Sequence, residues 1–185
     1  MQAESCQAYV QEVLKFRKAM NLTSISDAEI FQSRFIKPSL ALAQWIPEHG
    51  RILDIGSGMG VPGIPLLIAK PSLTGVLVER RKKRAEFLRH VVRKLGLNAE
   101  VYDADIQALR PLKVDICVAR AVSDERQMLE MCNPHVNPAA VAVFPVPRSH
   151  SPVDVAGWVV SGEYAINIDD ADGGKQIIRC YQHSL

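Results

Sequence analysis

The stretch that decides the fold is residues 51–79, which read RILDIGSGMGVPGIPLLIAKPSLTGVLVE. A short apolar run opens it and ends in a turn that holds three glycines, at residues 56–60. Residues 63–70 then read as a helix, and residues 75–79 as a second apolar strand. Apolar strands that alternate with helices are typical of a parallel sheet covered on both faces. We therefore predict a βαβ unit here.

The glycine-rich turn indicates a ligand site. Its glycines let the backbone turn tightly and approach a ligand, and the following helix directs unpaired amides to the same place. Glu79 ends the next strand, where a carboxylate can accept both hydroxyls of a ribose. Two ligand classes compete at this point. A dinucleotide fingerprint reads G-x-G-x-x-G, but Val61 stands at its third glycine. The observed G-x-G-x-G resembles the S-adenosylmethionine loop of class I methyltransferases.

The rest of the chain extends this α/β pattern. Further strands are predicted at residues 99–103, 114–119, 139–146, 164–168 and 176–181. Helices are expected at residues 81–95 and 124–132, and the turn Asp172-Gly173-Gly174 favours a final antiparallel hairpin. The predicted architecture is a seven-stranded, mostly parallel sheet.

The first 50 residues show only helical periodicity. One helix is expected over residues 5–20. A second begins near Ser26, which forms a capping-box pattern with Glu29, and runs toward Trp45 with a break at Pro38. We expect residues 1–50 to form a helical cap on a domain of residues 51–185, the two making one compact unit.

Composition excludes several classes of protein. Apolar residues make up 48% and charged residues 23%, which excludes disordered, collagen-like and coiled-coil chains. The four cysteines are scattered without a C-x-x-C pair, so we predict neither a metal site nor a disulfide framework. With no signal sequence or membrane-length apolar run, we expect a soluble, cytoplasmic protein.

The charge is distributed unevenly along the chain. The formal net charge is only +2, but residues 80–94 hold eight Lys or Arg and one acid. The first five of these residues, 80–84, directly follow Glu79, the proposed ribose-binding residue. We predict RNA contacts from these five, Arg80, Arg81, Lys82, Lys83 and Arg84.

Several motifs beyond the glycine loop make the likeness to a family specific. They are Asn21-Leu22-Thr23, Pro62-Gly63-Ile64-Pro65, Lys83-Arg84 with Phe87-Leu88-Arg89, and Arg120-Ala121-Val122. Together they resemble the glucose-inhibited division protein B family, which are bacterial 16S rRNA guanine-N7 methyltransferases. The Pro-Gly-Ile-Pro extension is the most specific motif, because most class I methyltransferases lack it.

This resemblance implies a Rossmann-like class I methyltransferase fold that uses S-adenosylmethionine to methylate N7 of a guanine in 16S rRNA. The expected partner is 16S rRNA or the 30S subunit, and we expect a monomer. Carried over to this chain, the cofactor-binding residues are Gly56, Ser57, Gly58, Gly60, Val61, Glu79, Ile106, Gln107 and Arg120. Arg120 is the nearest candidate for a catalytic role. Guanine N7 already carries an in-plane lone pair, so no general base is expected.

The substrate side departs from the family pattern. The family's R-H-x-x-D-S reads Arg34 to Ser39 here, with Phe35 and Pro38 at its histidine and aspartate positions. The family's K-G pair after the fifth strand is replaced around Pro145. These departures leave an alternative open, a non-catalytic or altered-substrate relative that binds S-adenosylmethionine and either RNA or a protein partner.

Overall fold

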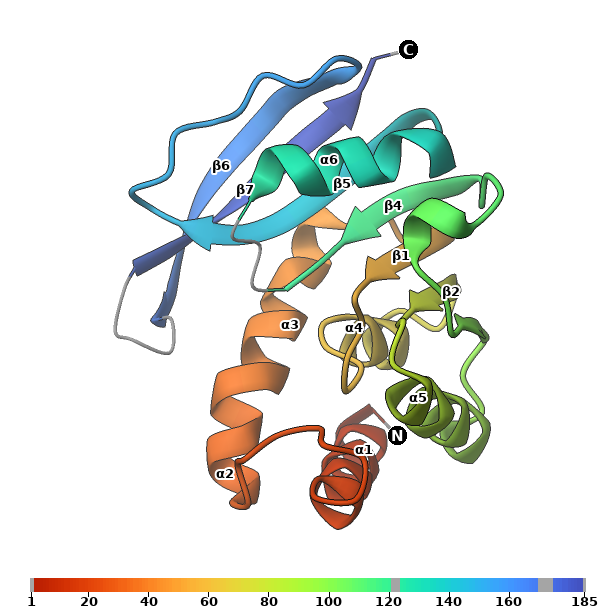
Figure 1. Cartoon of the computed structure of the whole chain (residues 1–185). Helices are drawn as coiled ribbons and strands as arrows, with labels where there is room; N and C mark the ends of the chain where they lie inside the picture. The colour runs from red at the N-terminus through yellow and green to blue at the C-terminus, as the bar shows by residue number, and fades with distance from the viewer. Residues whose placement is uncertain (1, 121–123, 170–174, 185) are drawn as a thin grey trace.

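The computed structural model describes residues 2–120, 124–169 and 175–184. Within these ranges seven strands form one sheet in the order β3-β2-β1-β4-β5-β7-β6 (Figure 1). The strands are β1 (Gly50–Ile55), β2 (Leu73–Val78), β3 (Ala99–Tyr102), β4 (Val114–Val118), β5 (Val136–Pro147), β6 (Trp158–Asp169) and β7 (Lys175–His183). The first five strands pair in parallel, and β7 runs antiparallel to both β5 and β6. The mostly parallel, seven-stranded sheet is confirmed.

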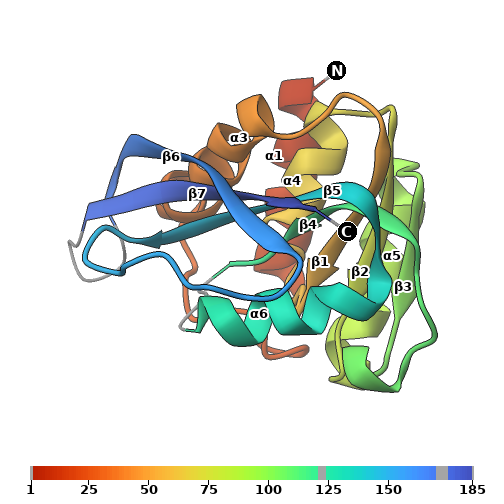
Figure 2. The same ribbon diagram turned by 90° about the horizontal axis from the view of Figure 1, so that it is seen from above.

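Helices cover both faces of this sheet (Figure 2). They are α1 (Gln2–Phe16), α2 (Ala28–Phe31), the π-helix η1 (Gln32–Ile36), α3 (Lys37–Ala41), η2 (Leu42–Trp45), α4 (Gly63–Ala69), α5 (Lys82–Leu95), η3 (Ile106–Ala108), α6 (Glu125–Cys132) and η4 (Asn133–His135). The N-terminal helices pack with α4 and α5 in one core, to which Val13, Ile64 and Leu88 belong. Helix α6 packs on the opposite face through Leu129, beside Phe144. No helix in the described ranges is long and apolar enough to cross a membrane.

The N-terminal helices differ from the prediction at three points. Helix α1 ends at Phe16 rather than at residue 20. The cap of α2 is Asp27, whose carboxylate accepts from the Ile30 amide at 2.9 Å, so the Ser26 capping box is wrong. The break at Pro38 is also wrong, because helical structure continues to Trp45. A proline clashes with the carbonyl four residues earlier, and the wide π-turn immediately before Pro38 accommodates it.

The C-terminal half holds longer strands than predicted. β6 begins at Trp158, and the hairpin turn expected at residues 172–174 lies outside the described residues. Pro145 lies within β5, opposite Ile178 of β7. The pairing of β5 with β4 ends at Val143, so at Pro145 strand β5 pairs with β7 alone. A proline, which has no backbone N–H to donate, is tolerated where a strand has a neighbour on one side only.

Candidate cofactor and substrate site

The loop between β1 and α4 holds the predicted cofactor glycines at the carboxyl edge of the sheet. The amides of Gly56 and Ser57 donate to the Val78 carbonyl at 2.9 and 3.1 Å, which ties the loop to the end of β2. Gly56 has a φ of +70°, and a Cβ there would meet no atom within 4 Å. Gly56 therefore borders open space, where a ligand can approach the backbone closely.

Two other glycines of the motif serve packing. A Cβ on Gly60 would lie 3.3 Å from the Tyr9 hydroxyl, which itself donates to the Met59 carbonyl at 2.9 Å. A Cβ on Gly63 would lie 2.6 Å from Oδ2 of Asp54. The Pro-Gly-Ile-Pro extension thus lets α4 begin directly against a buried carboxylate. Helix α1 supports the loop from the other side.

Glu79 holds the loop and the start of α5 together. Its side chain is 5% exposed. One carboxylate oxygen accepts from the Gly58 amide at 2.9 Å, and the other from the Arg81 amide at 2.8 Å. An ionised carboxylate has about four acceptor positions, so each oxygen retains capacity for a ribose hydroxyl. Glu79 can therefore orient the loop and bind a ligand at once.

We expect Glu79→Ala to weaken the binding of S-adenosylhomocysteine by about 1 to 3 kcal/mol, because buried hydrogen-bond donors lose their acceptor. Isothermal titration calorimetry measures this loss. Glu86→Ala is the matched control, since Glu86 is an exposed acid on α5 whose carboxylate pairs with Arg89. An unchanged affinity in Glu79→Ala rejects the ribose role.

A pocket of about 300 Å³ opens beside Glu79. Its lining residues are Ile55, Gly56, Val78, Glu79, Arg80, Arg81, Arg84, Ala104, Asp105, Ile106 and Met131. Ile106, one of the predicted cofactor-binding residues, lies in this lining, whereas the exposed Gln107, also predicted, does not. Ser57 and Val61 are buried within the loop. No group of three or more His, Cys, Asp or Glu side chains in the described part of the chain is arranged for a metal ion.

Asp54 is a functional candidate that the sequence reasoning missed, although it opens the quoted D-I-G-S-G run. Its side chain is 1% exposed, and Oδ2 accepts from the Gly63 amide at 3.1 Å. Oδ1 is buried without a hydrogen-bond partner in the described structure. Burial raises the pKa of Asp54 to about 7, and the negative charge of Glu79 adds to the rise while the Gly63 amide opposes it. Two acids thus lie beneath the loop.

Arg120 stands at the end of β4, next to the strand that leads into the glycine loop. Its guanidinium carbon lies 4.0 Å from the centroid of the Phe35 ring. The structure shows no hydrogen bond or ion pair between this guanidinium and a described residue. Burial, with a smaller effect of Arg34, lowers the pKa of Arg120 to about 10. The rest of the Arg-Ala-Val motif, residues 121 and 122, lies outside the described residues.

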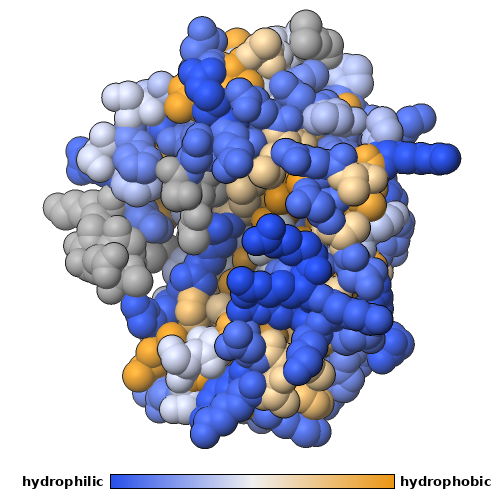
Figure 3. Space-filling view, viewed as in Figure 1, coloured by the Kyte–Doolittle hydropathy of each residue, from blue (hydrophilic) through white to orange (hydrophobic). Residues whose placement is uncertain are grey.

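The basic segment divides into free and engaged side chains. Arg89 binds Asp103 and Glu86, and Lys94 binds Glu12. Exposed cations without a side-chain hydrogen bond or ion pair to the described residues are Arg80, Arg81, Lys82, Lys83 and Arg93. Strongly hydrophilic side chains gather near the middle of the face seen in Figure 3.

Arg84 has a structural role in addition to its place in the pocket. Its Nε and Nη2 atoms donate to the Asn21 carbonyl at 3.1 and 2.6 Å. Asn21 has a φ of +51° and begins the Asn-Leu-Thr motif, in which Leu22 is buried. Two motifs that lie 63 residues apart therefore meet here. This contact anchors the turn after α1 to α5.

Comparison with known proteins identifies the family. A profile of the rRNA small subunit methyltransferase G family matches residues 2–144. The chain belongs to this family. It is 32% identical to ribosomal RNA small subunit methyltransferase G of Xylella fastidiosa over 92% of this chain and 82% of the relative. The enzyme of the same name from Cereibacter sphaeroides is 33% identical over 92% of this chain and 86% of its own length.

Solved structures show the same fold at low sequence identity. A putative methyltransferase, yhhF from Escherichia coli, is 16% identical with a TM-score of 0.64, over 80% of this chain and 86% of that chain. TYW2 of M. jannaschii, solved in complex with AdoMet, is 15% identical with a TM-score of 0.62, over 80% of this chain and 75% of that chain. The class I methyltransferase fold is confirmed.

The departures from the family pattern fall on two elements, the N-terminal helix that carries Phe35 and Pro38, and strand β5. Phe35 places a ring under Arg120, and Pro38 continues the helix that carries it. Pro145 lies in β5, whose pairing in this region is with β7 alone. The loop from β1 to α4, by contrast, keeps the family's glycines.

Proposed function

We propose that this chain transfers a methyl group from S-adenosylmethionine to N7 of a guanine in 16S rRNA. The observation that carries the proposal is the cradle in which Gly56 borders open space while Glu79 is held by the Gly58 and Arg81 amides. Membership of the rRNA small subunit methyltransferase G family supports the substrate. We further propose that the protein acts in the cytoplasm as a monomer, with residues 1–50 as a helical cap.

The residues of the cradle fit this cofactor chemically. S-adenosylmethionine, when bound, supplies a methyl group activated by a sulfonium, and it also carries an ammonium. The unpartnered Oδ1 of Asp54 and the carboxylate of Glu79 lie under the loop, where acids favour a cationic ligand. The pocket lined by Glu79 and Ile106 offers a polar and an apolar wall for an adenosine.

The chain's own task in this reaction is positioning. Guanine N7 has a lone pair in the ring plane, so no side chain has to remove a proton first. Holding nucleophile and methyl group in line, with water excluded, can supply most of the acceleration.

Two measurements test the proposal. Calorimetric titration with S-adenosylmethionine is expected to show binding at micromolar protein concentration. Transfer of a labelled methyl group to 30S subunits or free 16S rRNA from a methylation-deficient strain then tests the reaction, with modification-site mapping to identify N7. Lack of binding contradicts the proposal, whereas binding without transfer to either substrate favours the non-catalytic alternative.

We expect the combined change Arg81→Gln, Lys82→Gln and Lys83→Gln to flatten the salt dependence of RNA binding. Each phosphate contact releases counterions, so the slope of log K against log salt is expected to fall by about 2 to 3. Filter binding of a 16S rRNA fragment between low and moderate salt measures the slope.

A matched triple variant controls for net charge. Lys15, Lys18 and Lys113 are exposed cations outside the basic segment, and Lys113 precedes β4 at the sheet edge opposite the glycine loop. Changing these three to Gln is expected to leave most of the slope. If the two triple variants show equal slopes, residues 81–83 do not contact RNA specifically and form only a solvated helix face.

A further inference from the structure

A contact between the helical cap and the catalytic edge of the sheet has no assigned role. Phe35 comes from the π-helix η1, and Arg120 comes from the end of β4. The Arg120 guanidinium carbon lies 4.0 Å from the Phe35 ring centroid. Phe31 packs on Phe35 with 4.8 Å between ring centroids, and Tyr9 packs on Phe31 at 6.3 Å. An aromatic row thus connects the cap to one cation.

The guanidinium at the end of this row is in an unusual setting. It is half-buried, and burial together with a smaller effect of the Arg34 charge lowers its pKa to about 10. Within the described ranges it forms no hydrogen bond or ion pair. A cation removed from water without an anion is unfavourable, and the face of an aromatic ring compensates only in part. The N–H groups of Arg120 are therefore available to an anion.

The surroundings indicate which anion this is. Arg120 follows β4, which pairs with β1, the strand that enters the glycine loop. Tyr9 and Arg120 are close enough for each to shift the pKa of the other, and the Tyr9 hydroxyl donates to the Met59 carbonyl within that loop. Arg120 therefore lies beside the glycine loop, which resembles an S-adenosylmethionine loop, and the cofactor's amino-acid part is the part that carries an anion. That anion is a carboxylate.

We propose that Phe35 is a positioning residue whose ring holds the Arg120 guanidinium for the carboxylate of the cofactor. The inference rests on the proposed use of S-adenosylmethionine. Position 35 is histidine in the family pattern, so the device belongs to this chain's own sequence. A phenylalanine ring supports the guanidinium at every pH, because it adds no titratable charge beside Arg34 and Arg120.

Two probes that differ only in the amino-acid part test this role. S-adenosylhomocysteine carries the carboxylate, whereas 5′-methylthioadenosine keeps the adenosine and the sulfur but lacks it. Phe35→Leu is expected to weaken S-adenosylhomocysteine binding about 3- to 30-fold and to leave the affinity for methylthioadenosine unchanged. Phe35→Tyr keeps the aromatic ring and is expected to bind S-adenosylhomocysteine with the wild-type affinity.

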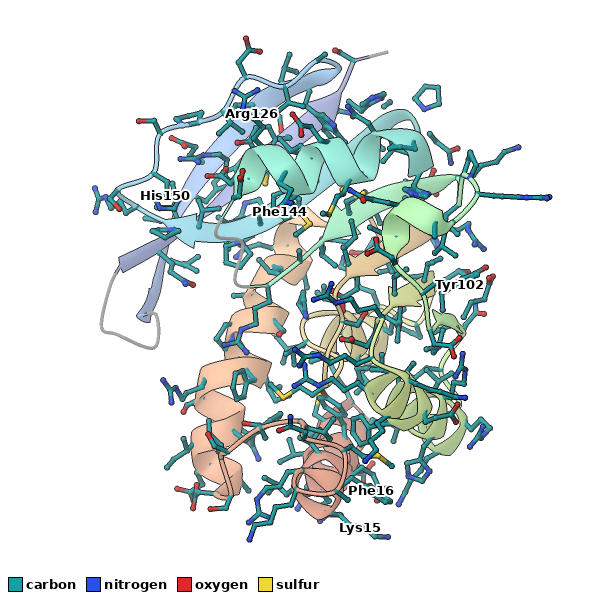
Figure 4. All side chains as sticks on the ribbon, viewed as in Figure 1. Lys15, Phe16, Tyr102, Arg126, Phe144 and His150 are labelled. Carbon is teal, nitrogen blue, oxygen red and sulfur yellow. The ribbon has the colours of Figure 1, made fainter. Side chains whose placement is uncertain are left out.

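Phe16→Leu is the matched control for loss of an aromatic ring in the cap. Phe16 is the last residue of α1 and is labelled in Figure 4; its ring packs against Phe87 and His90, and the Lys15 ammonium lies over it. We expect this variant to bind both probes as the wild type does. Equal weakening of both probes by Phe35→Leu indicates a general packing role and overturns the proposal.

A double-mutant cycle with Arg120→Met shows whether Phe35 acts through Arg120. In the Arg120→Met background, Phe35→Leu is expected to cause no further loss of S-adenosylhomocysteine affinity. If the two substitutions weaken S-adenosylhomocysteine binding independently, so that their effects multiply, the proposal is overturned. It is also overturned if both single variants bind S-adenosylhomocysteine normally but bind RNA more weakly, because the guanidinium then contacts phosphate. Failure of the wild type to bind either probe contradicts the proposed cofactor itself, a result distinct from all of these.

Discussion

Arg179→Met is expected to lower the free energy of unfolding by about 3 to 5 kcal/mol, because it leaves a buried carboxylate without its counter-ion. Arg179 is 1% exposed. Its Nη1 donates to Glu125 at 2.5 Å, its Nε to Glu163 at 2.6 Å, and its Nη2 to the His150 carbonyl at 2.6 Å. The other oxygen of Glu125 accepts from the Tyr181 hydroxyl at 2.7 Å. Urea denaturation measures the loss.

The network around Arg179 joins four parts of the C-terminal half. Glu125 begins α6, Glu163 belongs to β6, and the His150 carbonyl belongs to the segment after β5. Phe144 and His150, labelled in Figure 4, show where β5 passes beneath α6 and where that segment follows it. Loss of the arginine should therefore loosen the sheet edge formed by β5, β7 and β6.

A second variant distinguishes a lost counter-ion from lost packing. In the double variant Arg179→Met with Glu125→Gln, no charge remains at position 125, while the amide oxygen can still accept from Tyr181. We expect the double variant to recover more than half of the stability that Arg179→Met loses. A double variant as unstable as the sum of the two single variants contradicts this explanation.

The sheet could be predicted because its evidence is local. The apolar runs alternate with helices, and the glycines between β1 and α4 mark where the chain turns at the carboxyl edge. The π-turn before Pro38 was not predictable in the same way, since proline within a helix ordinarily signals a break. Tertiary packing of Phe31 and Ile36 in the first core holds the helix together there.

The candidate site shows the same limit. The position of Glu79 beside the glycine loop was predictable, because one βαβ unit separates the loop from Glu79 and brings the ends of both strands to the same edge of the sheet. The contact of Arg120 with Phe35 spans 85 residues, and that of Arg84 with Asn21 spans 63, so no local pattern indicates either. Asp54 was missed because its importance comes from burial, which a sequence does not display.

That burial leads to the second large effect, a pH dependence of stability that Asp54→Asn is expected to remove. Aspartate has an ordinary pKa of 3.8, and burial raises the pKa of Asp54 in the folded protein to about 7. The folded state therefore binds this proton more tightly than the unfolded state does. The contribution of Asp54 to stability is fully present below pH 3.8, is lost as the pH rises toward 7, and is constant above that.

A rise of this size corresponds to about 4 kcal/mol of unfolding free energy. An asparagine keeps an acceptor for the Gly63 amide but has no proton to lose, so it isolates the ionisation from the hydrogen bond. Urea denaturation of both proteins from pH 4 to pH 8 measures the effect. We expect the wild type to lose stability relative to Asp54→Asn across this range, chiefly between pH 4 and 7. Parallel profiles would mean that Asp54 ionises at its ordinary pKa and that burial does not penalise its charged form.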